Sequence, residues 1–85
     1  PIGIGEFNQQ AFSVWPNPAS HSIKLNSAVF DLNNSILEVW NASGQMVFRK
    51  ARPSGAISID QLASGMYQLK LTDGRKSEVL RLVVD

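Results

Sequence analysis

The segment from Gly65 to Leu71 constrains the fold more than any other part of the chain, because its side chains alternate in character. One side of the alternation carries the large apolar and aromatic residues Tyr67, Leu69 and Leu71. The other side carries Met66, Gln68 and Lys70. Successive side chains of a β-strand point to opposite faces of the sheet, so the pattern predicts a strand with one buried face. A helix is excluded because no apolar stripe with a 3.6-residue period runs through the segment.

A sharp turn is expected immediately before this strand, at Ala63–Gly65. Glycine reaches positive φ without strain, so Gly65 can adopt a backbone conformation that a larger residue would resist. Leu62 precedes the turn and is expected to cover the edge of the core.

Short alternating segments of the same kind recur along the chain and are separated by turn signals at the spacing usual for β-sandwiches. The expected strands are Phe12–Trp15, Ser22–Asn26, Ile36–Asn41, Met46–Ala51, Ala56–Asp60, Gly65–Leu71 and Lys76–Val84. The sequence therefore predicts an all-β, antiparallel sandwich of about seven short strands. Residues 27–35 fit either an irregular strand or a cover for the bottom of the core.

Proline and glycine mark the main corners. Pro16 and Pro18 flank Asn17, and because neither proline can donate a ladder hydrogen bond, the first strand is expected to end there in a stiff corner. Gly44 supplies the left-handed residue of a hairpin loop at 41–45, and the Asp73-Gly74 pair predicts a second hairpin.

The side chains that face the core can be predicted for the hairpin around residues 41–45 and for the last strand. Val39 and Val47 are expected on the core side of the hairpin that turns at 41–45, with Trp40 packing beside the sheet edge. The last strand has apolar residues on both faces near its end, where Leu82 and Val84 alternate with Arg81 and Val83. Such a strand is either covered on both sides or available to a partner.

The length, cysteine count and net charge of the chain limit the classes of function that it can have. The chain has 85 residues, no cysteine and a formal net charge of +1, so one domain must be held by its core alone, without disulfides or thiolate metal sites. Lysine and arginine are scattered, and the basic stripe of a nucleic-acid-binding protein is missing. Residues 1–10 are expected to be a flexible linker, either a cleavage region or non-native residues, ahead of a domain spanning residues 11–85.

Few residues suggest chemistry. His21 lies between two serines, but nothing in the spacing supplies a carboxylate to orient it, so a catalytic triad is not predicted. Asp31, Asn33 and Asn34 offer oxygen ligands for calcium but lack the established loop pattern, and turn formation is favoured for them. No catalytic, cofactor-binding or metal-binding residue is therefore expected, and the chain is not expected to be an enzyme.

Trp15 and Trp40 keep a binding function open. Each follows a core-facing position by one residue, so the two rings could form a platform for sugar rings on a carbohydrate-binding or accessory module. Packing at a core or sheet edge is the favoured interpretation. A purely structural spacer of an adhesin is a third alternative.

Four ordered blocks of residues together resemble a known family. They are WPNPAS at 15–20 with IKL at 23–25, LEVWN at 37–41 with ASGQMV at 42–47, ISI at 57–59, and LASGMYQLKL at 62–71. This arrangement resembles the C-terminal sorting domain of type IX secretion cargo, the Por secretion signal of Bacteroidetes, from about Phe12 to the end of the chain. The motif positions that carry the resemblance are Pro16, Asn17, Pro18, Gly44, Leu62, Gly65 and Tyr67.

The resemblance implies an immunoglobulin-like sandwich at the C-terminus of a secreted or surface protein. It also implies a cargo domain upstream, transit through the periplasm, recognition by the type IX translocon, and arrival at the cell surface or outside. A sortase-like peptidase would cut upstream of the first strand, within Ile2–Gln10. No nucleic acid, cofactor or small-molecule substrate is implied.

The end of the chain departs from the family pattern. Members often finish with a basic residue or two, whereas this chain ends Arg81, Leu82, Val83, Val84, Asp85, so either Arg81 takes that role or the native terminus is altered. We expect the translocon to recognise these five residues at the exposed edge and end of the last strand, Glu78–Asp85, by strand addition. The same strand could also join two copies into a dimer.

Overall fold

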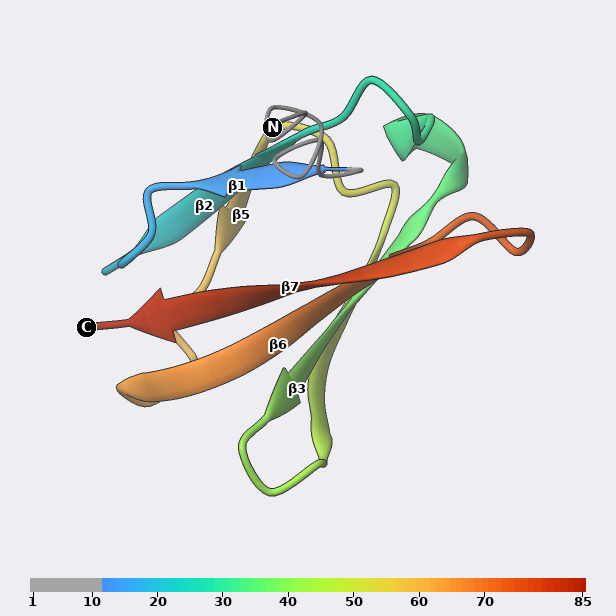
Figure 1. Ribbon diagram of the computed structural model, residues 1–85. Helices are drawn as coiled ribbons and strands as arrows, with labels where there is room; N and C mark the ends of the chain where they lie inside the picture. Colours follow the sequence, from blue (N-terminus) through green and yellow to red (C-terminus); the bar gives the residue numbers. More distant parts are fainter. Residues whose placement is uncertain (1–11) are drawn as a thin grey trace, which may run out of the picture.

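Two antiparallel sheets packed face to face make up the computed structural model, which describes residues 12–85 (Figure 1). The three-stranded sheet has the order β1-β2-β5, formed by Ser13–Trp15, Ser22–Asn26 and Ala56–Ser58. The four-stranded sheet has the order β4-β3-β6-β7, formed by Met46–Ala51, Ile36–Asn41, Gly65–Thr72 and Ser77–Val84. The expected all-β sandwich of about seven strands is confirmed.

The core lies between the sheets and is centred on β6. Leu69 and Leu71 are completely buried, and Leu69 pairs with Val39 of β3 on one side and Leu80 of β7 on the other. Ile23 and Ile57 close the core from the three-stranded sheet. Burying one such side chain contributes roughly 1.5–3 kcal/mol to the free energy of folding, so the buried side chains of β6 help to hold the two sheets together. The buried apolar residues are Phe12, Ala19, Ile23, Leu25, Phe30, Leu37, Val39, Ile57, Ile59, Tyr67, Leu69, Leu71, Leu82 and Val84.

The β3–β4 hairpin differs from expectation in two ways. Val47 is solvent-exposed, and Phe48 instead lies opposite Val39 and packs against the core. The reason is a register shift between Val39 and Trp40 that adds one residue to β4 and reverses the alternation beyond it. Trp40 does not pack beside a sheet edge as expected, because β3 is an interior strand. Trp40 lies on the outer face of the sheet, where its Nε1 donates to Glu38 Oε1 at 3.1 Å.

The segment from Ser27 to Ser35 covers the core, the second of the two expected alternatives. Phe30 is buried, and its ring meets the ring of Phe12 edge-on with centroids 6.5 Å apart. A single 3₁₀ turn, η2 (Leu32–Asn34), follows. Asp31 caps this turn by accepting from the backbone N–H of Asn33 at 3.0 Å, so the expected turn role of Asp31 is confirmed.

The start of β6 has the conformation that the sequence suggested. Gly65 has a φ of +152°, outside the range that side chains readily adopt, and a Cβ there would meet no atom within 4 Å. Tyr67 anchors the preceding loop by donating from its hydroxyl to the carbonyl of Ala63 at 2.6 Å. Leu62 is partly buried and packs against the core, as expected. The requirement for glycine at this position is therefore conformational and not steric.

Replacing Gly65 with valine is expected to destabilise the domain by at least about 1–2 kcal/mol, because a branched side chain must hold this strained φ. Urea unfolding followed by Trp fluorescence measures the change. Met66→Val, one residue along the same strand and half-exposed, is the matched control and should leave the midpoint nearly unchanged. A Gly65→Val midpoint equal to that of the wild type would contradict the conformational assignment.

Candidate functional site

The turn between β1 and β2 lies against the C-terminal end of β7 (Figure 1). We call residues Pro16–Ala19 of this turn the Pro-Asn-Pro corner. The side-chain amide of Asn17 donates to the carbonyl of Arg81 at 2.9 Å, and its oxygen accepts from the backbone N–H of Val83 at 3.0 Å. One exposed side chain thus holds two backbone groups of a strand more than 60 residues away in the sequence.

Ala19 continues the same contact with its backbone. Its N–H donates to the carbonyl of Val83 at 2.9 Å, and its carbonyl accepts from the N–H of Asp85 at 2.8 Å. Ala19 is fully buried and forms an isolated parallel bridge with Val84. The corner therefore occupies the place of a further strand along the end of β7, and it joins the two sheets of the sandwich.

The sequence explains why this corner bends away and does not extend β1. Proline has no N–H to donate, so neither Pro16 nor Pro18 can bond to β7 through a backbone N–H, and the side-chain amide of Asn17 makes the contact there. Both peptide bonds that precede these prolines, Trp15–Pro16 and Asn17–Pro18, are cis.

The expectation that Arg81–Asp85 present an exposed strand edge is wrong for most of that segment. The outward backbone groups of Val83, the carbonyl of Arg81 and the N–H of Asp85 are all bonded to the corner. Leu82 and Val84 are buried, and Val83 is half-buried. Only the first half of β7, Ser77–Leu80, has neither the corner nor another strand of residues 12–85 on its outer side.

Several motif positions converge on this end of the molecule. Gly65 pairs with Val84, and Tyr67 pairs with Leu82, so the start of β6 flanks β7 on the side opposite the corner. Gly44, with a φ of +84°, lies in the β3–β4 turn and helps to line a surface hollow beside Met66 and Arg81. These motif positions therefore lie together at one end of the sandwich, although they are far apart along the chain.

The other residues considered from the sequence lie elsewhere. His21 and Asp60 form a pair with Nδ1 3.1 Å from Oδ1, which sequence spacing missed because 39 residues separate them. Both side chains are largely solvent-exposed, and in the described part of the chain no serine hydroxyl hydrogen-bonds to His21. Across residues 12–85, no three His, Cys, Asp or Glu side chains gather as a metal site requires.

The two tryptophans do not form one platform. Trp15 pairs with Lys24 on the outer face of the three-stranded sheet and is 47% exposed. Trp40 pairs with Gln68 on the outer face of the other sheet. The rings therefore lie on opposite faces of the sandwich, and the shared sugar platform considered from the sequence is wrong.

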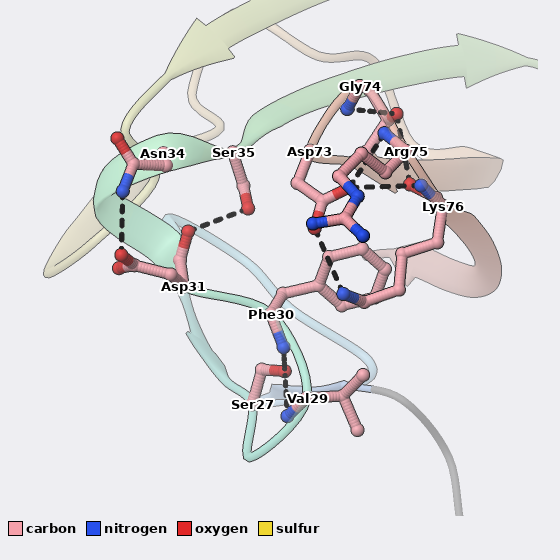
Figure 2. Close-up of polar contacts among 11 residues, drawn as sticks. Ser27, Val29, Phe30, Asp31, Asn34, Ser35, Asp73, Gly74, Arg75 and Lys76 are labelled. Carbon is pink, nitrogen blue, oxygen red and sulfur yellow. Dashed lines mark hydrogen bonds and ion pairs between the residues drawn. The ribbon is translucent and has the colours of Figure 1, made fainter.

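The β6–β7 turn packs against the loop that carries Phe30 (Figure 2). Asp73 Oδ1 accepts from the backbone N–H groups of Lys76 and Arg75, each at 2.9 Å, and the Lys76 ammonium lies 3.0 Å from Oδ2. These hydrogen bonds, led by that from the Lys76 backbone, hold the pKa of the Asp73 carboxyl well below its usual range. The same ammonium lies 5.2 Å from the centroid of the Phe30 ring.

Comparison with known protein families assigns this chain to a family. The profile of the secretion system C-terminal sorting domain matches residues 13–85. The chain belongs to this family of type IX secretion sorting domains. Sorting domains of this family are the C-terminal signals that mark proteins for secretion to the cell surface or outside through the type IX system. The carbohydrate-binding alternative is not favoured.

A solved structure shares the fold of this sorting domain. It is that of PorZ, described as an essential bacterial surface component of the type-IX secretion system of Porphyromonas gingivalis. The TM-score is 0.65 at 17% sequence identity, and the match covers 87% of this chain and 11% of PorZ. A search of curated proteins gave no match. Within residues 12–85, no helix of the sorting domain has the length and hydropathy to cross a membrane.

Asn17→Ala should lower the free energy of unfolding by about 1–2 kcal/mol, because two hydrogen bonds to β7 are lost. Amide hydrogen exchange should accelerate at Val83, whose N–H faces the corner, more than at Leu82, whose N–H faces β6. Asn26→Ala removes an exposed asparagine on β2 and is the matched control. Unchanged exchange at Val83 would contradict the assigned contact.

Asp73 should shape the acid limb of the stability curve. A carboxyl whose folded-state pKa is depressed contributes stability above its unfolded pKa and loses it as the pH falls below about 4. Asp73→Asn should therefore lower the Tm at pH 6 and flatten its decline between about pH 4 and pH 2. Asp60→Asn retains Asp73 and should retain the steep limb. An equally steep limb in Asp73→Asn would contradict the prediction.

Proposed function

We propose that the type IX machinery recognises the folded end of this domain, where the Pro-Asn-Pro corner and Arg81–Asp85 form one surface. The observation that carries the proposal is the set of four hydrogen bonds by which Asn17 and Ala19 hold the end of β7. Because these bonds occupy the outward edge, the last residues are displayed as part of a folded corner and not as a free strand. A receptor would then contact both segments at once.

The wider setting of the proposal follows the family. The domain acts as a non-enzymatic signal attached to an upstream cargo, which crosses the periplasm before export. A sortase-like peptidase removes the domain by cutting within Ile2–Gln10, a segment that lies outside the described residues. A cut within Ile2–Gln10 would lie upstream of β1, which begins at Ser13. Pairing of two copies through the open half of β7 remains part of this proposal.

Export of a fused reporter tests the recognition surface. Deleting Val83–Asp85 removes three of the four corner hydrogen bonds and leaves only that from Asn17 to the carbonyl of Arg81. The reporter is therefore expected to remain in the periplasm of a bacterium that has the type IX system. Asn17→Ala should reduce export in the same direction while leaving β7 at full length. The measurement is the reporter activity in periplasmic and surface fractions.

A matched variant separates recognition from stability. Asp73→Asn weakens the β6–β7 turn at the other end of β7, away from the corner, and should leave export close to normal. Normal export of the truncated form would overturn the proposal. A parallel loss of export in Asn17→Ala and Asp73→Asn, in proportion to their loss of stability, would also overturn it.

A further inference from the structure

The outer face of the four-stranded sheet displays large apolar side chains to solvent. Met66 is 51% exposed on β6, and Val79 is 56% exposed on β7. Met46 of β4 pairs with Trp40 of β3 and is also exposed. Gln68, Lys70 and Arg81 lie between these side chains in the register of the sheet, so the face presents exposed apolar and charged side chains next to one another.

The charge of this face is positive. Arg49 and Lys70 pair across the sheet with Glu38 from its two sides, and Arg81 lies opposite Gln68. Glu38 is directed to the indole of Trp40 by the 3.1 Å hydrogen bond from Nε1. Within residues 12–85, no carboxylate forms an ion pair with these three cations. Glu38 offsets part of the charge of Arg49 and Lys70, whereas the residue opposite Arg81 is the neutral Gln68, so the face keeps a net positive charge for a partner.

A hollow lies beside the cations. Its volume is about 270 Å³, and it is lined by Asn41, Ala42, Gly44, Met66, Tyr67, Gln68 and Arg81. The hollow is at the small end of the ~300–1,000 Å³ range of binding sites and is large enough to admit one side chain of a larger partner. Arg81, which helps to line the hollow, has its backbone carbonyl held by Asn17.

We infer that this face binds an extended acidic segment of another protein. The segment places one apolar side chain in the hollow beside Met66 and sets carboxylates against Arg81 and Lys70. Charge complementarity selects an acidic partner, and the apolar hollow selects one that alternates carboxylates with an apolar side chain. An anionic polysaccharide lacks the apolar group, and a flat lipid surface would not enter the hollow.

The inference shares Arg81 with the folded corner, but it uses the Arg81 side chain on the outer sheet face and not the backbone carbonyl that Asn17 holds. Because peptide binding is measured on the chain by itself, its failure is distinguishable from a failure of export. The probe is a fluorescein-labelled nonapeptide with two leucines set among glutamates, and its matched form has glutamine in place of glutamate. Fluorescence anisotropy gives the affinity, and ¹H–¹⁵N spectra locate the shifted amides. We expect the glutamate peptide alone to bind, with the largest shifts on β6 and β7 around Met66 and Arg81.

Two charge reversals provide the decisive comparison. Arg81→Glu should weaken binding at least about tenfold, whereas Lys24→Glu, the same change on the outer face of the other sheet, should leave it within about twofold. Met66→Ser, a substitution at an exposed position, should also weaken binding, because it removes an apolar side chain that lines the hollow. Circular dichroism verifies that each variant is folded.

The inference is overturned if the glutamate peptide fails to bind at millimolar concentration, or if Lys24→Glu weakens it as much as Arg81→Glu. If the glutamine peptide bound with the same affinity as the glutamate peptide, charge would play no part in binding, and the inference would again be overturned. Arg81-dependent binding to phosphatidylglycerol vesicles, without peptide binding, would replace the protein partner by a lipid surface and would equally overturn it.

Discussion

Burial of the apolar side of β6 is the constraint on which the rest of the sandwich depends. β6 is an interior strand, so Leu69 and Leu71 contact neighbours on both sides within their own sheet as well as the core supplied by the other sheet. A chain without cysteine has no covalent bond to hold its sheets together, and apolar burial has to supply that attraction. The positive φ of Gly65 and the hydroxyl bond of Tyr67 fix where this strand begins, and thereby fix its register against β7.

The register of β6 in turn determines where β7 ends and what the Pro-Asn-Pro corner meets. Gly65 lies opposite Val84, so the last residues of β7 project level with the turn between β1 and β2. An unprotected strand edge at this position would invite pairing with other chains. Asn17 and Ala19 occupy it and simultaneously connect the two sheets, so one short segment protects the edge and closes the sandwich.

Most of the fold could be predicted from the sequence because alternation and turn chemistry are local. The bounds of β2, β3 and β4 follow directly from them. Val47 could not be placed, because the added residue of β4 opposite Val39 and Trp40 depends on pairing between strands. The pair of His21 with Asp60, and the hold of Asn17 on Arg81 and Val83, join residues far apart in sequence and leave no local signal. The candidate site was therefore predicted as separate motifs, and only the fold shows them as one end of the molecule.

The hydrogen bonds of the corner to the end of β7 do not depend on the side chain at position 85. An asparagine side chain presents one acceptor and two donors from a planar amide, so it can bond a strand edge much as a peptide group does. All of the groups that Asn17 and Ala19 contact on β7 belong to its backbone. The side chain of Asp85 takes no part in these bonds. A substitution at position 85 would therefore change the charge displayed beside the corner and leave its backbone hydrogen bonds in place.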